Sequence, residues 1–374
     1  MSRGEYDVAV IGAGLMGAGT ALFLARGGMR CVLLDRKGIC SEASGVNAGT
    51  LTMQMTRADL IPYAMKGWEM WTHSREWLGL NPGVVATPGL SLAFTEEEVA
   101  ILEYRAAARR ERGAEIELIT ASRARSLEPG LSNAVMAAAY CATDGFAKAN
   151  ETGFVLNRAL VDAGVDINGS AVVDRLEPEN SCYAVISGQD IVRATRVVLA
   201  GGVWLEEMLG WLGVRIPIKT LVNQLGVTER IAPVMHTVIG IASGLLSLKQ
   251  FDNGTVVIGG GWQGRGDRQT GISAVVPENL VGNARLAVHA VPGLSNTRLV
   301  RAWCGFEAET ADAMPLLGPV PGIADAFVIG SVHSGYTSGP FMAKLLSEHM
   351  LGHDSALPLF DPQRLIENKE LQPQ

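Results

Sequence analysis

The 374-residue chain has few cysteines, few aromatic residues and no long apolar run, and each shortage excludes a class of protein. Its five cysteines form no C-x-x-C pair and its six histidines are scattered, so neither a zinc site nor an iron–sulfur cluster is predicted and no metal is expected. No stretch of 18 apolar residues is present, and the polar start MSRGEYD lacks the pattern of a signal peptide. We therefore expect a cytoplasmic protein with reduced, buried thiols and no transmembrane segment.

Charge of one sign is also in short supply. The chain has 31 basic and 38 acidic side chains, a formal net charge of −7, and no block of Lys and Arg. Nucleic acids and anionic membranes are therefore not expected as partners. With 374 residues, of which 48% are hydrophobic, the chain is long enough for two domains with a large core.

The amino-terminal segment has the pattern of a nucleotide-binding unit. The apolar, β-branched run Tyr6–Ile11 predicts a strand buried on both faces. The glycine-rich stretch GAGLMG follows, then a helical stretch over 18–26 and a second apolar strand over 30–34 that ends at Asp35. The order strand, glycine turn, helix, strand and acid is typical of a dinucleotide-binding fold.

Each part of this unit has a physical reason. Gly12 permits the tight turn, Gly14 lets backbone amides approach a pyrophosphate, and Gly17 lets the helix pack closely on the strand. Asp35 lies 23 residues after Gly12, near the spacing expected for an acid that binds ribose hydroxyls. We predict an adenine dinucleotide here; the alternative is a purely structural glycine turn.

Two further stretches favour FAD over NAD(P). The small-residue segment Ser41–Gly49 suits a second approach to phosphate and ribityl oxygens, although it could be an ordinary loop. Near the carboxy end, an apolar strand over 327–330 leads into the glycine-rich loop 331–340 and an apolar helix over 341–350. Such a unit can direct backbone amides and a helix N-terminus at the electron-rich edge of a flavin ring, or it could be a structural turn.

The rest of the chain indicates an α/β protein, α+β overall, in which a Rossmann-like FAD-binding domain carries a second, antiparallel-sheet substrate domain. Helical patterns fill 59–78, 96–112, 151–163 and 277–290, whereas 216–261 has short strands and turns without a long helix. The predicted FAD-binding domain comprises residues 1–80, 142–215 and 300–374, and the predicted substrate-binding domain comprises residues 81–141 and 216–299.

Five segments in order resemble the D-amino acid oxidase-like flavoproteins, which include glycine oxidase and sarcosine oxidase: GAGLMG, EASGVNAG, TRVVLAGGVW, RAWCGFEAETADAMPLLG and HSGYTSGP. Within that family, VIGGGW and HSGYTSGP are similar to catalytic β subunits of opine (octopine or nopaline) oxidases and dehydrogenases, hydroxyproline dehydrogenase and hydrogen cyanide synthase. Such catalytic chains work with a larger redox partner subunit that carries additional centres.

The resemblance implies a reaction. A small secondary-amine amino acid would lose a hydride to flavin N5, and the resulting imine would hydrolyse to an amine or amino acid and a 2-oxo acid. Three alternatives stay open: oxidation of glycine, sarcosine, a D-amino acid or hydroxyproline; a non-catalytic FAD-binding electron-relay subunit; and an NAD(P)-dependent dehydrogenase.

Three positions depart from the family pattern. Glu307 stands where glycine oxidase has its carboxylate-binding arginine, and Thr337 stands where monomeric sarcosine oxidase has a carboxylate-binding lysine. Gly305, beside Cys304, stands where that enzyme has its covalent flavin cysteine, so the resemblance implies non-covalent FAD. Glu307 could face a cationic part of the substrate, or it could be a structurally paired acid.

The resemblance and the motifs together give two sets of candidate residues. For FAD they are Gly12, Gly14, Leu15, Met16, Asp35, Arg36, Ser44, Ala48, Gly49, Val173, Gly201, Trp204, Gly305, His333, Ser334, Gly335, Tyr336 and Thr337. For the substrate they are Glu307, Trp262, Tyr336, Arg57, Arg265 and His333, with the two arginines as replacement carboxylate binders and His333 as a proton shuttle or a loop-fixing residue. Because the flavin would carry the chemistry, no acid–base residue is assigned.

Overall fold

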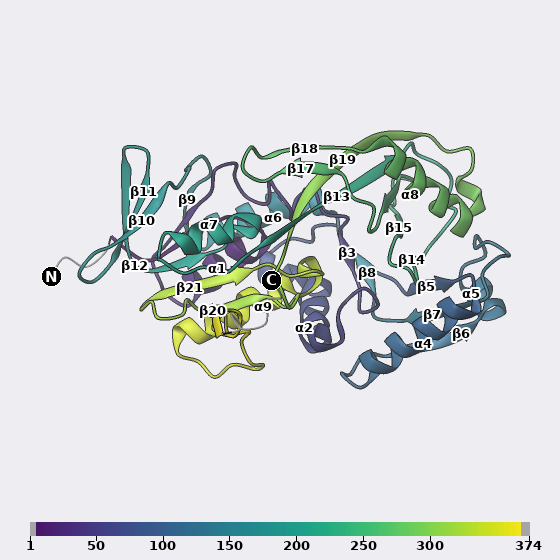
Figure 1. The fold of residues 1–374 in the computed structure, drawn as a ribbon, viewed down its shortest axis with the longest axis horizontal. Helices are drawn as coiled ribbons and strands as arrows, with labels where there is room; N and C mark the ends of the chain where they lie inside the picture. The colour runs from purple at the N-terminus through teal and green to yellow at the C-terminus, as the bar shows by residue number, and fades with distance from the viewer. Residues whose placement is uncertain (1–4, 368–374) are drawn as a thin grey trace, which may run out of the picture.

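The computed structural model describes residues 5–367 as an elongated molecule with two lobes, each built on its own eight-stranded sheet (Figure 1). The FAD lobe contains the first sheet, in which β12 pairs with β1 and β21, and β1 pairs with β2, all in parallel. Its strands are β10 (Arg175–Pro178), β11 (Tyr183–Ser187), β12 (Asp190–Leu199), β1 (Tyr6–Ile11), β2 (Cys31–Leu34), β9 (Asp166–Asn168), β20 (Leu316–Pro319) and β21 (Ala326–Gly330).

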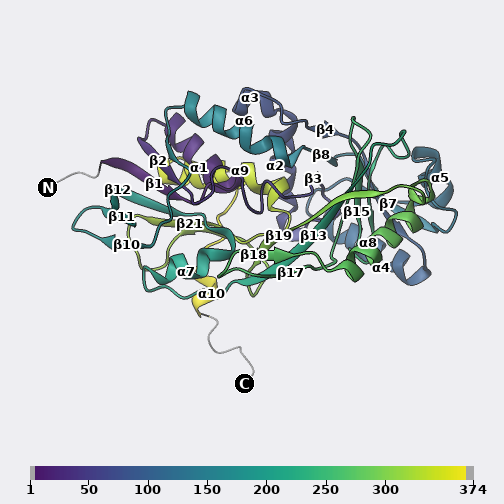
Figure 2. The same cartoon turned by 90° about the horizontal axis from the view of Figure 1, so that it is seen from above.

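Helices cover both faces of this sheet, which explains why its strands are apolar on both sides. Val8 and Val10 of β1 pack into one core cluster, and Ala9 and Ile11 pack into the other. Figure 2 shows most of the helices on one face and α7 on the opposite face. These helices are α1 (Leu15–Arg26), α2 (Ile61–Thr72), α3 (Ser74–Leu78), α6 (Ala149–Asp162), α9 (Gly335–Leu351) and α7 (Leu205–Gly210).

The substrate lobe contains the second sheet, which is antiparallel except for the parallel pair β5 and β14. Helix α4 packs on one face, and α5 and α8 pack on the other. The strands, in sheet order, are β19 (Leu299–Glu309), β13 (Lys219–Thr228), β16 (Val256–Gly259), β15 (Ser247–Gln250), β14 (Val238–Ile241), β5 (Gly89–Ala93), β7 (Ala137–Cys141) and β6 (Ile116–Thr120), and the helices are α4 (Glu96–Arg110), α5 (Ala121–Leu127) and α8 (Pro277–Ala290).

Short elements complete the fold. A small three-stranded sheet lies where the two lobes meet, and a hairpin extends beside β13 and β19 (Figure 1). They are β3 (Thr50–Leu51), β4 (Val85–Ala86) and β8 (Gly145–Phe146) in the sheet, β17 (Arg265–Asp267) and β18 (Ile272–Ala274) in the hairpin, the 3-10 helices η1 (Ala58–Leu60), η2 (Gly202–Trp204) and η3 (Pro292–Leu294), and α10 (Arg364–Glu367). Within residues 5–367, every helix is too short or too polar to cross a bilayer.

The structure confirms the predicted α/β class and differs from the sequence prediction in detail. Helix α9 begins at Gly335, six residues before the predicted start, and includes Pro340. A proline inside a helix leaves the carbonyl four residues earlier without its usual donor. Here the indole Nε1 of Trp71 donates to that carbonyl, on Tyr336, at 2.7 Å, so the helix continues through the proline.

The predicted domain boundary at residue 300 stays a prediction. The structure pairs residues 299–309, as β19, with β13 of the substrate lobe over ten residue pairs. Because β13 and β19 are ten and eleven residues long, they extend beyond the other strands of their sheet toward the FAD lobe (Figure 1).

Candidate functional site

A single cavity of about 950 Å³ runs between the two lobes and collects most of the predicted site residues. This volume is at the upper end of the range for small-molecule sites, which suits a ligand as long as a dinucleotide together with a substrate. All predicted FAD residues line this cavity except Gly49. Of the predicted substrate residues, Glu307, Tyr336, Arg57 and His333 line it, whereas Trp262 and Arg265 do not.

The turn between β1 and α1 depends on glycine for close backbone packing. Gly12 has φ +107°, and a Cβ atom there would lie 2.4 Å from the carbonyl oxygen of Ala200. A Cβ atom on Gly17 would lie 2.0 Å from the carbonyl oxygen of Gly12. At Gly14, by contrast, the nearest atom would be Ser44 Oγ at 3.4 Å, so the turn is open toward the cavity there. These positions fit the roles that the sequence predicted for the three glycines.

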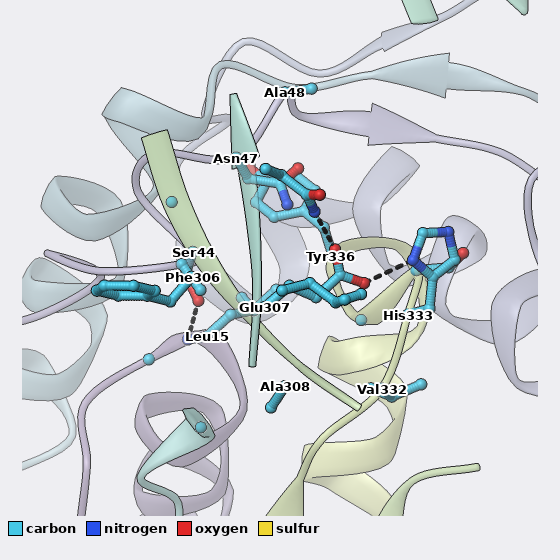
Figure 3. A pocket seen from close by; sticks show the side chains of 18 of the residues that line it. Leu15, Ser44, Asn47, Ala48, Phe306, Glu307, Ala308, Val332, His333 and Tyr336 are labelled. Atoms are coloured by element: carbon cyan, nitrogen blue, oxygen red, sulfur yellow. Dashed lines mark hydrogen bonds and ion pairs between the residues drawn. The ribbon is translucent and has the colours of Figure 1, made fainter. Parts of the chain in front are cut away.

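The first turn of α1 presents backbone amides to the cavity. The helix has no side-chain cap and no acidic residue in its first turn. The Leu15 amide donates to Ser44 Oγ at 2.9 Å, which ties the small-residue loop to the glycine turn (Figure 3). An uncapped helix N-terminus that faces a cavity is suited to an anionic group such as a phosphate.

Asp35 and Arg36 lie at the end of the cavity formed by β2 and η2. Asp35 Oδ2 accepts from the Ala13 amide at 2.7 Å, and its other oxygen accepts from the Lys37 amide at 2.8 Å. The Arg36 guanidinium lies 3.8 Å from the centre of the Trp204 ring, a cation–π contact that fixes both side chains. Val173 and Gly201 line the same end, in keeping with the predicted adenosine region.

Gly49 supports the cavity without lining it. Its amide donates to Asn47 Oδ1 at 2.8 Å, and a Cβ atom there would lie 2.0 Å from the Ala147 carbonyl oxygen. Its neighbours Ala48 and Thr50 do line the cavity.

A second uncapped helix N-terminus faces the cavity at the start of α9. Ser334 has φ +63° and its hydroxyl donates to the Met55 carbonyl oxygen at 3.2 Å, whereas Thr337 Oγ1 accepts from the Thr52 amide at 3.2 Å. The small β3 segment and the carboxy-terminal loop are therefore tied together. The N-termini of α1 and α9 thus border one cavity from opposite ends of the sequence.

Tyr336 contributes its backbone to the site, because its side chain is buried in the core of the FAD lobe. The ring stacks on Trp71 with centroids 5.0 Å apart, and the hydroxyl pairs with Thr152 Oγ1 at 2.6 Å. Burial raises the pKa of the Tyr336 hydroxyl well above its ordinary value. This placement does not support the prediction that the Tyr336 side chain binds substrate.

Glu307 and His333 form a hydrogen-bonded pair in the cavity (Figure 3). Glu307 Oε1 lies 2.5 Å from His333 Nδ1, and Glu307 Oε2 accepts from the Asn223 side-chain amide. The hydrogen bond to Glu307 raises the pKa of His333 above its ordinary value, although partial burial opposes the shift. Both oxygens of Glu307 thus have protein donors, as expected of a structurally paired acid, and a cationic substrate group near it stays a prediction.

The three remaining substrate candidates have other surroundings. Arg57 lines the cavity but forms an ion pair with Glu309 at 3.3 Å. Arg265 is exposed on β17. The Trp262 ring packs against Gly282 of α8, where a Cβ atom would lie 2.6 Å from it. The structure therefore leaves the substrate-carboxylate ligand unassigned among the predicted residues.

Cys304 and Gly305 point to opposite faces of β19, because successive strand residues alternate. Gly264 packs against Cys304, since a Cβ atom on Gly264 would lie 2.5 Å from Cys304 Sγ. Gly305 lines the cavity, and Cys304 does not. This arrangement supports the prediction of non-covalent FAD.

Sequence reasoning missed several charged residues at the cavity or immediately behind its wall. Asp144 is buried and accepts from the Met53 amide at 2.7 Å, and burial raises the pKa of its carboxyl to about 6. Lys249 is fully buried, and burial lowers the pKa of its amine to about 7; it donates to the hydroxyl of Thr50. Arg105 and Arg109 of α4 also line the cavity.

Only part of this could have been found from the sequence. Arg105 and Arg109 are four residues apart in a helix with an apolar face, and such a like-charge pair is a signal for a bound anion. For Lys249 the signal is a single lysine in an apolar strand, whereas Asp144 lies in a turn that carries no recognisable motif.

Comparison with known proteins shows the family. A profile described as FAD dependent oxidoreductase matches residues 7–349, so the chain belongs to this family and is an FAD-binding enzyme. A subunit of the opine oxidase of Rhizobium meliloti is 28% identical, with 89% of this chain and 90% of that protein covered. Glycine oxidase of Geobacillus kaustophilus is 25% identical, with 95% of each chain covered.

Solved structures confirm the fold. L-proline dehydrogenase from P. horikoshii superimposes with a TM-score of 0.88 at 23% identity, covering 98% of this chain and 99% of that one. The glycine oxidase structure from Geobacillus kaustophilus gives a TM-score of 0.84 at 23% identity, covering 94% and 96%. The predicted resemblance to the D-amino acid oxidase-like flavoproteins is thereby confirmed.

The residues present fit FAD. Gly14 leaves space beside two α1 amides that have no side-chain cap, as a pyrophosphate requires. The uncapped start of α9 provides a second amide-rich edge in the same cavity, as the electron-rich edge of a flavin requires.

Proposed function

We propose that this protein oxidises the C–N bond of a small secondary-amine amino acid, of the opine type, as the catalytic subunit of a hetero-oligomeric dehydrogenase. The observation that carries the proposal is the shared cavity. The Glu307–His333 pair lies in the same cavity as the start of α9, so a substrate beside the pair would also lie beside the proposed flavin edge. Relatives named as single subunits of opine oxidase and of sarcosine oxidase support the substrate class.

The chain supplies position, electrostatics and a proton site. When bound, FAD supplies the two-electron acceptor, so no protein nucleophile is required. The amides at the start of α9 would stabilise negative charge at the edge of the ring. His333 would hold a proton at Nδ1 against Glu307, and the elevated pKa of His333 favours that protonated state. The pair is therefore close to neutral overall and would tolerate a substrate of either charge.

Anaerobic reduction of the bound flavin tests the proposal. The purified protein is mixed without oxygen with octopine, nopaline, proline derivatives, sarcosine and glycine, and the absorbance of the oxidised flavin is followed. We expect a secondary-amine amino acid to bleach the flavin faster than glycine. If dithionite reduces the flavin but every amine leaves it oxidised, the chain is an electron-relay subunit and the proposal is wrong.

The partner subunit and the location belong to the same proposal. Two large apolar side chains, Phe154 and Val161, are exposed two turns apart on α6, which is consistent with a covered surface in an assembly. All five cysteines are free thiols, as expected for a cytoplasmic protein. Co-purification of the chain from its own cells, followed by mass determination of the complex, tests both the partner and its redox centres.

A further inference from the structure

Two arginines on α4 line the cavity without an acidic partner. We call Arg105 and Arg109 the α4 arginine pair. Arg105 Nη1 donates to the Ala242 carbonyl oxygen at 2.6 Å, and Arg109 Nε donates to the Thr56 carbonyl oxygen at 2.8 Å. Within residues 5–367, neither guanidinium lies within 4 Å of a carboxylate oxygen, and their remaining N–H groups have no protein acceptor. Each arginine is thus anchored by one bond and keeps donors for a ligand.

The helix places this pair where a packing residue would be expected. Leu102 and Ala106 of α4 are buried against the sheet, and Arg105 and Arg109 continue the same face at spacings of three and four residues. Like charges one turn apart repel, and partial burial strengthens the repulsion. Burial and the neighbouring Arg105 lower the pKa of Arg109 to about 10. An anion bound between the two guanidiniums would relieve both effects.

Charge balance in the cavity indicates what kind of anion. Arg57 is paired with Glu309, and His333 is paired with Glu307, so these groups cancel. The α4 arginine pair then faces only the Asp144 carboxyl, which leaves one positive charge in excess. An ordinary amino acid, with one ammonium and one carboxylate, would not neutralise this excess. A secondary amine with two carboxylates would.

We propose that the α4 arginine pair binds the second carboxylate of the substrate, so that the preferred substrate is a dicarboxylic secondary amine. This inference rests on the proposed function. A guanidinium binds a carboxylate through two parallel N–H bonds, and two guanidiniums one helical turn apart can share its oxygens. The pair thereby takes the place of the family's anion clamps, which are Glu307 and Thr337 in this chain.

A matched pair of probes isolates the second carboxylate. Iminodiacetate and sarcosine are both small secondary amines and differ by one carboxylate. In anaerobic flavin reduction by the wild-type protein, we expect an apparent Kd at least tenfold lower for iminodiacetate. Arg109→Gln and Arg105→Gln should raise the apparent Kd for iminodiacetate at least tenfold, change that for sarcosine less than threefold, and leave the limiting reduction rate within threefold.

Controls separate this role from a structural one. Arg110→Gln changes the next residue on α4, which bonds the Ile116 carbonyl and does not line the cavity, and should behave as wild type. Arg109→Lys keeps the charge and should recover part of the affinity. Calorimetry with glutarate, a dicarboxylate that cannot be oxidised, should show weaker binding in both glutamine variants at unchanged flavin content and Tm.

The outcomes distinguish the two proposals. If no amine reduces the wild-type flavin, the proposed function fails. If amines do reduce it but the glutamine variants lose affinity for iminodiacetate and sarcosine equally, or for neither, the assignment of the α4 arginine pair is overturned. A loss of flavin or of thermal stability in the glutamine variants, with Arg109→Lys giving no recovery of glutarate binding, would also overturn it.

Discussion

The two ends of the cavity are built in different ways. At the α1 end, backbone atoms form the surface, because Gly12, Gly14 and Gly17 leave no side chains between helix, strand and cavity. At the α4 end, the surface consists of charged side chains, including Arg105, Arg109 and Asp144. A backbone site tolerates little change and suits one invariant cofactor. A side-chain site can be re-specified by a few substitutions and suits a substrate that varies among relatives.

The largest effect should come from breaking the backbone end. Gly12→Ala places a Cβ atom 2.4 Å from the Ala200 carbonyl oxygen at φ +107°, so we expect a loss of more than about 4 kcal/mol in the free energy of unfolding and no bound flavin. Thermal denaturation and flavin absorbance after purification measure both. Gly14→Ala meets no atom closer than 3.4 Å and should stay folded while binding FAD more weakly.

The controls make this comparison specific. Gly210→Ala, at a position with ordinary φ and open space, should match wild type in both measurements. Retention of flavin by a folded Gly12→Ala protein would contradict the backbone account of this end.

The next effect concerns the buried amine behind the cavity wall. Lys249→Met should stabilise the protein at pH 7 by about 2–4 kcal/mol, because the native state no longer has to hold an ammonium group in an apolar strand. The native pKa of about 7 lies below the unfolded value of 10.5, so between these pH values the unfolded wild-type chain binds the extra proton. Wild-type stability therefore rises with pH across this window, and the advantage of the variant shrinks.

Denaturant titrations from pH 7 to pH 10 measure this convergence. Lys66→Met, at an exposed helical position, is the matched control and should show no such pH dependence. A gap between wild type and Lys249→Met that is constant over the range would show that Lys249 is not buried as described.

The smallest effect on stability concerns the Glu307–His333 pair. Glu307→Gln removes the charge that raises the pKa of His333, so any limb of the pH profile for flavin reduction that His333 controls should move to lower pH. Because the His333 side chain is about half exposed, at 48%, the cost in stability should stay below about 1 kcal/mol. A raised native pKa stabilises below the unfolded value, so this cost should appear at acidic pH and vanish at alkaline pH.

Single-turnover kinetics between pH 6 and pH 9, with unfolding curves at the two extremes, measure both. His73, an exposed histidine on the α2–α3 connection, provides a control as His73→Gln. An unchanged pH profile in Glu307→Gln would mean that His333 does not titrate in the reaction.

The same contrast explains how far the sequence predicts the molecule. Local signals, such as the strand Tyr6–Ile11 and the GAGLMG turn, identify the FAD lobe because neighbouring residues determine those elements. The substrate lobe is predicted only in outline, because its sheet brings β5, β6 and β7 beside strands more than 100 residues later in the chain. Which charges face the cavity depends on that long-range pairing. The sequence therefore does not single out Arg109, and Trp262, predicted near the substrate, lies outside the cavity lining.

The contact between α1 and α9 has a consequence for biosynthesis. The two helices pack closely enough that a Cβ atom on Gly19 would lie 2.9 Å from that of Ala343, and Ser347 donates to the Thr20 carbonyl oxygen. Residues 329–337 close the cavity that begins at residue 11. A nascent chain therefore exposes an unfinished nucleotide fold until its last helix has left the ribosome. We expect cofactor loading to follow release of the chain, with chaperones protecting the open half-site until then.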